Sequence, residues 1–453
     1  MKEYKQVIRF DENCGLPVYD KVDVLVCGGG SAGAAAAATA AKGGCKTLLV
    51  ERLGFLGGAA VAGYSGTICG LFYCSDNARE NGPVQAVFGW ADDFYQEMIR
   101  RNHVTKPQLY GKTFLVPFDP QGWKEVAEDM VMAAGARILY HVSIVGVIVD
   151  GDCFKGVIID TKNGMAQIRA KVLIDATGDA DLIYRAGLDY TMGNDGEIQN
   201  PSMIFRLGNV DVDRFKSYWG EDTISPDKVT EAIKLYAQEN KYNMPRIKVW
   251  VYPTNRTGEL FMNVTLIQGR DGRSLNVCDP DDHTAAEQIS RQQVRAYAAF
   301  FKDKIPGCKE SFVNDLSCEV GVRQTRSVVG IEKLCNTDVA NACKRSDGIA
   351  RCPWPIELHD GERPYMFWLL DDCYEIPYGA LVPKVGENII VAGRNLSAEH
   401  QALASCRVTA QCFGYGQAAG VAAAKVISEN KRFRDIRGEE VRAVLNGQGA
   451  GLL

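Results

Sequence analysis

The stretch VLVCGGGSAGAAAAATA near the N-terminus constrains the fold more than any other part of the sequence. The apolar run at Val22–Val26 predicts a short buried strand, and Ser31–Lys42 predicts a helix because alanine is the best helix former. The turn between them reads G-x-G-x-x-G. Its glycines allow a tight turn, close approach of a pyrophosphate, and close packing of helix on strand. These three positions are Gly28, Gly30 and Gly33.

The segment after the helix completes a nucleotide-binding unit. Lys46–Val50 predicts a second strand that ends at Glu51, 18 residues beyond Gly33. A carboxylate about 20 residues beyond the glycines is expected to bind a ribose hydroxyl. Phosphates are expected at the helix N-terminus, where backbone N–H groups are free and the helix dipole is positive. This unit predicts a dinucleotide ligand without separating NAD from FAD.

Three further glycine-containing segments favour FAD. The stretch RLGFLGGAAVAGYSG follows Glu51 and would let backbone pass close to a flat ring system. A buried strand, VLIDAT, ends at a glycine, and a later strand, NIIVA, ends at Gly393. The chain thus leaves the nucleotide-binding fold after residue 200 and returns at about residue 376. This discontinuous arrangement suits an extended dinucleotide.

Composition excludes several classes of protein. The 453 residues predict two or three domains. The net charge of −5 argues against a nucleic-acid-binding protein. No apolar run approaches the roughly 18 residues that span a bilayer, and the N-terminus lacks a signal-peptide core. We therefore expect a cytoplasmic protein without membrane partners. The 15 cysteines contain no C-x-x-C, so we expect neither an iron–sulfur cluster nor another metal site.

Four stretches carry a resemblance to a known family. They are VLVCGGGSAG with LLVERLGFLGG, then IDATGDADL, then GVRQTRSVVGIEKL, and finally IPYGALVPKVGENIIVAGRNLSAEHQALASCRVTAQCFGYGQAAG. The chain resembles FAD-dependent oxidoreductases with a glutathione-reductase-type FAD fold. More narrowly, it is similar to the FAD_oxidored group, which is related to the flavin domain of heterodisulfide reductases. The resemblance extends from about Lys21 to about Glu429.

The resemblance and the sequence pattern together imply an α/β fold. We expect a Rossmann-like FAD-binding domain of glutathione-reductase type, a β-meander over residues 137–149 and 154–160, and an inserted mixed α/β substrate domain. The insertion is expected to contain a hairpin, VWVYPTN with LFMNVTLI, and a helix from about Thr284 to Lys302. The expected segments are an N-terminal extension (1–20), the first part of the FAD-binding domain (21–200), the substrate or cap domain (201–375), and the C-terminal part of the FAD-binding domain (376–453).

The resemblance also implies cofactor-binding roles. Phe55 and Leu56 precede the glycine pair where some relatives carry a histidine that tethers FAD, so non-covalent FAD is expected. The start of the last helix, around Ala404–Arg407, would direct N–H groups at the pyrimidine end of the flavin. The expected contacts are the pyrophosphate (Gly28, Gly30, Ser31, Ala32, Gly33), the adenosine ribose (Glu51, Arg52), the flavin (Gly57, Gly58), the adenine (Ile144), the adenosine half (Ala176, Thr177, Gly178), and the pyrophosphate or ribityl chain (Gly393, Arg394).

Candidate catalytic residues follow from the chemistry that a flavin leaves to the protein. Histidine is the natural acid or base near neutral pH, arginine can bind a substrate carboxylate or carbonyl, and a tyrosine hydroxyl can donate a proton. Structural histidines, salt bridges between domains and core packing remain competing interpretations. The candidates are His400, His359, Arg323, Arg326, Arg407 and Tyr378.

The sequence therefore predicts an FAD-dependent oxidoreductase that transfers hydride between flavin N5 and a small organic substrate. Dehydrogenation of a C–OH or C–C bond and reduction of a C=C bond both remain open. One alternative is a flavin electron-transfer subunit of a larger redox complex. Another is a non-redox flavoprotein such as an isomerase or hydratase. The electron donor or acceptor is unknown, and formation of a homo-oligomer is open.

Overall fold

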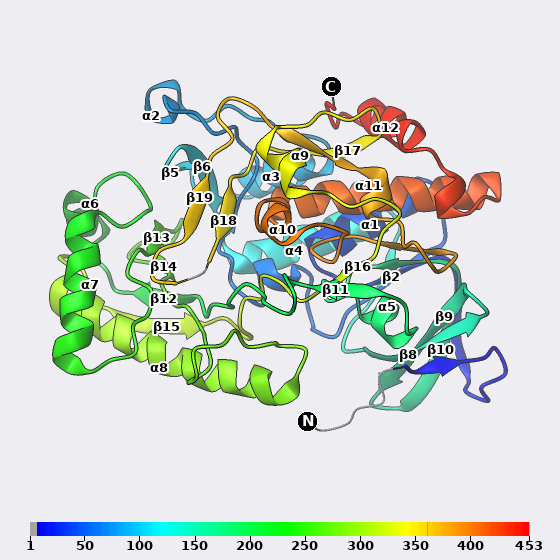
Figure 1. Ribbon diagram of the computed structural model, residues 1–453, viewed down its shortest axis with the longest axis horizontal. Helices are drawn as coiled ribbons and strands as arrows, with labels where there is room; N and C mark the ends of the chain where they lie inside the picture. The colour runs from blue at the N-terminus through cyan, green and yellow to red at the C-terminus, as the bar shows by residue number, and fades with distance from the viewer. Residues whose placement is uncertain (1–6, 360, 453) are drawn as a thin grey trace.

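The computed structural model describes residues 7–359 and 361–452 (Figure 1). Residues 1–6 of the predicted N-terminal extension, and residue 453 of the predicted C-terminal segment, lie outside the described residues. The remaining chain forms a mixed α/β structure. Its main sheet lies on the right of Figure 1, and a smaller sheet covered by α6, α7 and α8 lies on the left.

The main sheet is built around parallel strands. Its parallel part has the order β21, β10, β2, β3, β7, so segments from both ends of the chain meet in one sheet. Parallel strands buried on both faces read as continuous apolar runs, as VDVLV and NIIVA do. This arrangement confirms the α/β class and a Rossmann-like nucleotide-binding sheet. The strands are β2 (Val18–Cys27), β3 (Thr47–Val50), β7 (Arg137–Leu139), β10 (Gly164–Asp175) and β21 (Ile389–Val391).

The predicted β-meander is present beside this sheet. β8 (Ser143–Asp150) pairs antiparallel with β9 (Cys153–Thr161), which pairs antiparallel with the first half of β10. β1 (Arg9–Phe10) lies parallel to β8. The expectation of one strand over 137–149 is wrong, because His141 adopts φ +57 and breaks it. β7 before the break extends the parallel sheet, and β8 after it begins the meander.

Two helices of the nucleotide-binding part pack closely against each other. α1 (Ser31–Lys42) and α11 (Thr409–Glu429) cross where a Cβ added to Gly416 would lie 2.0 Å from the Ala32 carbonyl oxygen. The small residues of both helices thus allow backbone to approach backbone. The expected start of the last helix at Ala404–Arg407 is wrong. The short helix α10 (His400–Cys406) ends there, and α11 begins after Val408, whose backbone is extended.

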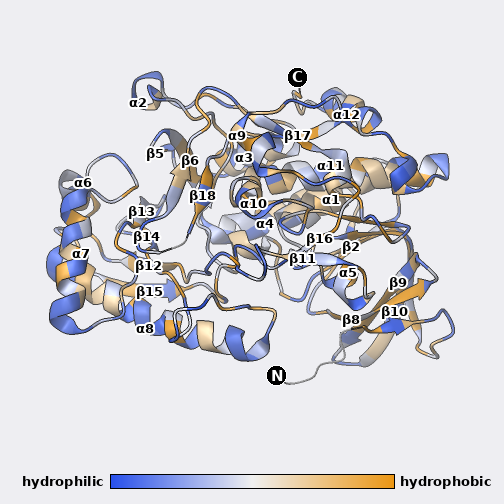
Figure 2. Cartoon of the chain, in the orientation of Figure 1, coloured by the Kyte–Doolittle hydropathy of each residue, from blue (hydrophilic) through white to orange (hydrophobic). Residues whose placement is uncertain are grey.

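The second sheet carries its own hydrophobic core. Its four antiparallel strands have the order β13, β14, β12, β15, and the hairpin formed by β13 and β14 confirms the predicted one. Hydrophilic residues alternate with hydrophobic ones along α7 and α8 (Figure 2), as expected where one helix face covers a sheet. These elements are β12 (Phe205–Gly208), β13 (Trp250–Pro253), β14 (Leu260–Asn263), β15 (Phe312–Leu316), α6 (Val212–Trp219), α7 (Asp227–Asn240) and α8 (Pro280–Lys304).

The remaining elements lie outside these two sheets, and several of their strands form small sheets of their own. The strands are β4 (Thr67–Ile68), β5 (Gln108–Tyr110), β6 (Thr113–Pro117), β11 (Tyr190–Met192), β16 (Arg326–Val328), β17 (Gly348–Cys352), β18 (Ile356–Leu358), β19 (Tyr365–Phe367) and β20 (Tyr374–Pro377). The helices are α2 (Ala78–Asn81), α3 (Trp90–Arg100), α4 (Pro120–Ala133), α5 (Asp181–Arg185), α9 (Asn336–Ala340) and α12 (Gly438–Gly447). Trp354 and Leu369 share a core with α1 and α11, although they fall within the predicted insertion.

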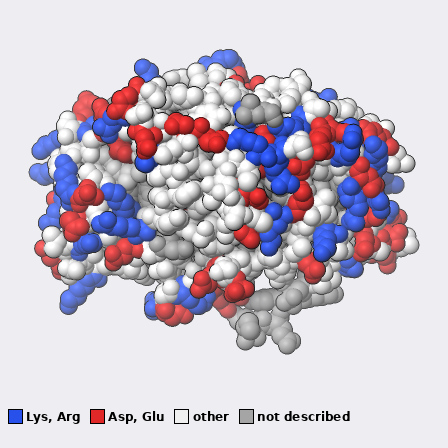
Figure 3. Space-filling model, turned by 45° about the horizontal axis from the view of Figure 1, so that its top comes forward, with Lys and Arg blue, Asp and Glu red and all other residues white. Residues whose placement is uncertain are grey.

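The surface carries charges of both signs. On the face shown in Figure 3, Lys and Arg are interspersed with Asp and Glu around a central area that has few charged side chains. In the part of the chain that the structure describes, no helix combines the length and the apolar character needed to cross a bilayer.

Candidate functional site

One cavity of about 490 Å³ joins the glycine turn of α1 to a buried polar pocket under the second sheet. Its walls come from both sheets and from the loops between them, so distant parts of the chain contribute to one site. Most of the predicted cofactor-binding residues line it. They are Gly28, Gly30, Ser31, Ala32, Glu51, Arg52, Gly58, Ile144, Ala176, Thr177, Gly178, Gly393 and Arg394.

The glycine turn leaves a cradle at the N-terminus of α1. Gly28 has φ +102, and a Cβ there would lie 2.5 Å from the Ala176 carbonyl oxygen. A Cβ on Gly33 would lie 1.8 Å from the Gly28 carbonyl oxygen, so Gly33 serves packing and does not line the cavity. A Cβ on Gly30 would meet only Gly58, at 3.8 Å, and would occupy the cradle itself. Helix N-terminus and cradle fit a pyrophosphate.

The glycine pair rests against this turn. The Gly57 N–H donates to the Gly29 carbonyl at 2.8 Å, and Gly57 has φ +130, which favours glycine. A Cβ on Gly58 would lie 2.8 Å from the Gly30 Cα. Gly58 lines the cavity, whereas Gly57 supports it from behind. The two glycine-rich loops therefore form one continuous backbone surface.

Glu51 directly follows the last residue of β3 and lies beside the cradle. Its carboxylate accepts hydrogen bonds from the backbone N–H of Gly29 at 2.6 Å and of Leu53 at 2.8 Å. Burial raises the pKa of Glu51, although both hydrogen bonds act in the opposite direction. The remaining lone pairs of its oxygens can accept ribose hydroxyls. Arg52 beside it forms an ion pair with Glu319.

An ion-pair network borders the cradle on its other side. Arg394 donates to Asp179 at 2.6 Å and to the Thr325 hydroxyl at 2.9 Å. Asp179 is half-buried, and although burial opposes its ionisation, Arg394 first and Thr325 second hold its pKa below the usual range. Arg326 donates to Asp181 at 2.5 Å and does not line the cavity. The structure thus joins Arg326 to this network and separates it from Arg323.

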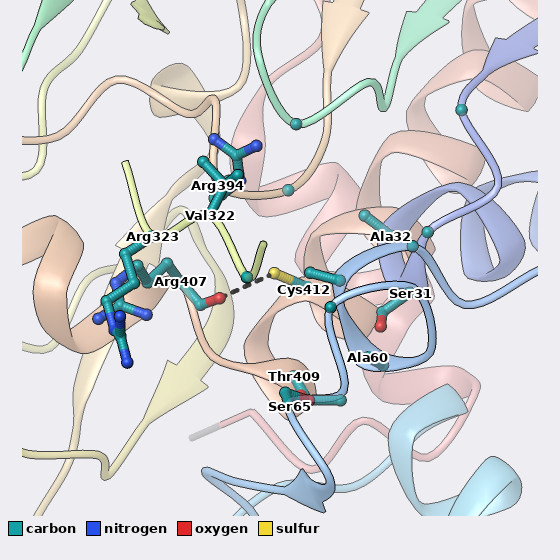
Figure 4. Close-up of a pocket in the computed structure, with 18 of the residues that line it drawn as sticks. Ser31, Ala32, Ala60, Ser65, Val322, Arg323, Arg394, Arg407, Thr409 and Cys412 are labelled. Carbon is teal, nitrogen blue, oxygen red and sulfur yellow. Dashed lines mark hydrogen bonds between the residues drawn. The ribbon is translucent and has the colours of Figure 1, made fainter. Parts of the chain in front are cut away.

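The N-terminus of α11 closes the middle of the cavity. Val408, Thr409 and Cys412 line it there, opposite Gly58 and Ala59. In Figure 4, Thr409 and Ser65 lie together, and the Cys412 thiol donates to the Arg407 carbonyl at 3.3 Å. Burial raises the pKa of Cys412 to about 12, so its thiol is protonated at neutral pH.

The far end of the cavity contains buried arginines. Arg323 and Arg407 extend into the same region in Figure 4, away from Arg394. Burial lowers the pKa of Arg323, and the charge of Arg407 lowers it further. Arg323 donates to the Asn200 carbonyl at 2.7 Å and to the Ser202 hydroxyl at 2.8 Å. Arg407 donates to the Gln199 side chain at 2.9 Å.

A histidine–glutamate pair lies beside these arginines. His359 Nε2 and Glu357 Oε1 are 2.9 Å apart, and the Tyr110 hydroxyl donates to the same oxygen at 2.8 Å. Burial first, and then Arg323, holds the pKa of His359 well below 6.5, so its imidazole is neutral. Burial opposes ionisation of Glu357, but His359, Arg407 and Tyr110 hold its pKa below the usual range. His359 Nδ1 is buried and has no hydrogen-bond partner.

Besides Arg326, two predicted catalytic residues, Tyr378 and His400, do not line the cavity. The Tyr378 hydroxyl donates to the Phe433 carbonyl at 3.0 Å and anchors the segment after α11. His400 is the first residue of α10 and does not line the cavity. Of the six candidates, the structure brings Arg323, Arg407 and His359 together in the cavity.

Sequence reasoning missed several residues of the far end. Glu357 could have been found, since a strand places Glu357 and His359, two residues apart, on one face. No sequence motif points to Arg246, because it lies in the loop between α7 and β13, where hydrophobic periodicity and motif spacing give no information. The missed residues that line the cavity include Tyr110, Tyr252, Asn263 and Trp354 at this end, and Asp179 and Asp181 beside the cradle.

Comparisons with solved structures show weak overall similarity. A geranylgeranyl bacteriochlorophyll reductase-like protein from Thermoplasma acidophilum is 16% identical, with a TM-score of 0.48, and covers 95% of this chain and 84% of its own. The p-nitrophenol 4-monooxygenase PnpA from Pseudomonas putida DLL-E4 is 12% identical, with a TM-score of 0.45, and covers 94% and 80%. A search of curated proteins finds no match.

The family comparison is decisive. The family model described as FAD dependent oxidoreductase matches residues 23–445, which include the glycine turn, the second sheet and α11. The cradle, Glu51 beside it and the paired glycine loops fit a dinucleotide cofactor. The chain belongs to the FAD-dependent oxidoreductase family, with FAD as its cofactor.

Proposed function

We propose that this enzyme transfers a hydride between flavin N5 of FAD and a small organic substrate bound among Arg323, Arg407 and His359. Bound FAD would supply the two-electron redox chemistry. The observation that carries the proposal is the single cavity that connects the glycine cradle to the buried His359–Glu357 pair.

The glycine end would hold FAD without a covalent bond. The backbone N–H groups at Gly30, Ser31 and Ala32 would bind the pyrophosphate, and Glu51 the adenosine ribose. The N-terminus of α11 at Thr409 would stabilise negative charge at the pyrimidine end of the ring. Ile144 and Thr177 would border the adenosine half.

We also propose the glutathione-reductase-type arrangement for this domain. The insertion over residues 201–375 would act as the substrate domain between FAD-binding segments 21–200 and 376–453. Its β14 contributes Asn263, and the segment after its last sheet strand contributes Arg323, to the far end of the cavity.

His359 would move the proton that accompanies hydride transfer. The His359 Nε2–H donates to Glu357, which fixes the tautomer and leaves the Nδ1 lone pair available as a base. Because the imidazole is neutral, Nδ1 can accept a proton from a substrate C–OH or C–H in the oxidative direction. Glu357 would stabilise the imidazolium that forms, as an orienting carboxylate does.

An anaerobic reduction experiment tests the proposal. The FAD-reconstituted enzyme is mixed with candidate alcohols and saturated acids, and the flavin absorbance is followed. We expect one substrate class to bleach the flavin of the wild-type enzyme. In His359→Gln, with FAD still bound, the rate of bleaching should be lower by a factor of about 10² or more. Arg100→Gln, an exposed substitution on α3, is the matched control.

Either of two results would contradict the proposal. The first is wild-type flavin reduction rates in His359→Gln. The second is turnover of a substrate without any change in flavin redox state, which would identify the non-redox alternative.

A further inference from the structure

The far end of the cavity has more positive than negative charge. Arg323 is 8% exposed, Arg246 is 1% exposed and Arg407 is half-buried, and all three lie near Glu357, the partner of the neutral His359. Three guanidinium groups therefore face one carboxylate. Two positive charges remain uncompensated by the side chains that surround them.

The hydrogen bonds of these arginines are incomplete as well. Arg407 Nε and one terminal nitrogen of Arg246 are buried without a partner. Arg246 donates to the Asn263 side chain at 2.9 Å, and Asn263 itself lines the cavity. Asn200 Oδ1 and the neutral His359 Nδ1 are also buried without partners, but as acceptors they cannot bind a carboxylate. Buried donors left unpaired are costly, so a ligand that pairs with them is expected.

Three other buried arginines of the described chain are paired with acids, whereas the buried Arg351 has no acidic partner. Arg206 pairs with Glu259 at 3.2 Å and with Asp315, and Arg442 pairs with Glu375 at 3.0 Å. Arg326 pairs with Asp181. The arginines of the far end donate instead to neutral carbonyl, hydroxyl and amide oxygens. A ligand carboxylate can take the position beside them that an acidic side chain takes beside Arg206, Arg326 and Arg442.

We propose that the substrate is a small dicarboxylate, whose two carboxylates bind at Arg323 and Arg407 with Arg246 behind Asn263 supplying further positive charge. Guanidinium groups bind carboxylates in a bidentate geometry, which would fix the orientation of the carbon chain. Trp354 and Tyr110, stacked with ring centroids 5.3 Å apart, give this end an apolar wall for that chain. The inference rests on the proposed function, because it names the substrate class of the same site.

Titration calorimetry of the purified, FAD-reconstituted enzyme tests the inference. Succinate is the probe, and succinamide, of the same shape without charge, is the control ligand. We expect succinate to bind about 30-fold or more tightly than succinamide, since loss of one buried charged partner costs a factor of at least this size. Binding should weaken similarly in Arg407→Gln and Arg323→Gln, and less in Arg323→Lys, which keeps the charge. Arg100→Gln should bind as wild type does.

The outcomes separate this inference from the proposed function. Equal binding of succinate and succinamide, in an enzyme whose flavin is still bleached by another substrate, would overturn the dicarboxylate and leave hydride transfer standing. Charge-selective binding of succinate that survives both Arg→Gln substitutions would also overturn it. Selective binding that the Arg→Gln substitutions abolish supports it, even in an enzyme that shows no flavin reduction.

Discussion

The two ends of the cavity are built in opposite ways. At the glycine end, backbone makes the site, and Asp179 and Arg394 neutralise each other 2.6 Å apart. At the arginine end, side chains make the site, and Arg407 Nε and His359 Nδ1 are buried without partners. At the glycine end, the protein's own groups balance the charge, and the backbone leaves space for a nucleotide. The second end is incomplete until a ligand supplies charge.

The largest effect is expected where backbone packing and cofactor binding coincide. Gly33→Ala places a Cβ 1.8 Å from the Gly28 carbonyl oxygen, so backbone must move. We expect loss of FAD binding and destabilisation by about 1–3 kcal/mol. Gly30→Ala is the matched variant, because its Cβ meets nothing closer than 3.8 Å. It should fold with wild-type stability within about 0.5 kcal/mol and still lose FAD affinity.

FAD fluorescence and urea unfolding of the FAD-free proteins measure both effects. Wild-type FAD affinity in Gly30→Ala would show that the cradle does not hold the pyrophosphate.

The next effect concerns chemistry at the arginine end. Glu357→Gln keeps a hydrogen-bond acceptor for His359 but removes the negative charge. We expect flavin reduction by substrate to slow by about 10-fold or more, because the imidazolium loses its stabilising partner. FAD affinity should be unchanged, since Glu357 lies at the other end. Rapid mixing under anaerobic conditions measures the rate of flavin reduction. Loss of FAD affinity in Glu357→Gln would contradict the assignment of FAD binding and substrate chemistry to different ends of the cavity.

His359 should make the free energy of unfolding depend on pH. Because the folded-state pKa lies well below 6.5, the unfolded chain binds the proton first as the pH falls. Above about pH 7, His359 does not change the free energy of unfolding. Below pH 6.5, it lowers this free energy by up to about 1.4 kcal/mol per pH unit. Urea unfolding at pH 7.5 and 5.5 should therefore show a larger loss for wild type than for His359→Gln. Equal losses would mean that His359 titrates normally.

The smallest effect is expected on stability at Arg407. A buried cation without an acidic partner destabilises the ligand-free fold, so Arg407→Met should leave its unfolding free energy unchanged or raise it by about 1 kcal/mol. Met keeps the side-chain length and packs against apolar neighbours. Arg442→Met is the contrast, because it would leave Glu375 buried and unpaired and should destabilise by about 3 kcal/mol. Thermal unfolding distinguishes the two, and similar losses in both would make Arg407 structural.

The same contrast explains what sequence reasoning could reach. The glycine end is local, because the strand, turn and helix at 22–42 follow each other along the chain, and spacing rules describe them. α1 was predicted at its observed bounds, Ser31–Lys42. The break at His141 was missed, since a single residue with positive φ leaves no pattern.

The arginine end is assembled from segments that are far apart in the sequence. The sequence pattern therefore predicted only some of its residues. His359, Arg323 and Arg407 were candidates by residue type, but so were Arg326 and Tyr378, which the fold directs to Asp181 and Phe433. Residue type cannot tell a paired arginine from an unpaired one. That distinction depends on which acids the tertiary fold brings near, and only the structure supplies it.

A crystal structure of the FAD-reconstituted enzyme tests the central claim most directly. We predict the pyrophosphate at Gly30 and Ser31, the flavin ring between Gly58 and Thr409, and its reactive edge open to the pocket of His359 and Arg407. A flavin ring directed away from His359, or FAD bound elsewhere on the molecule, would contradict the account.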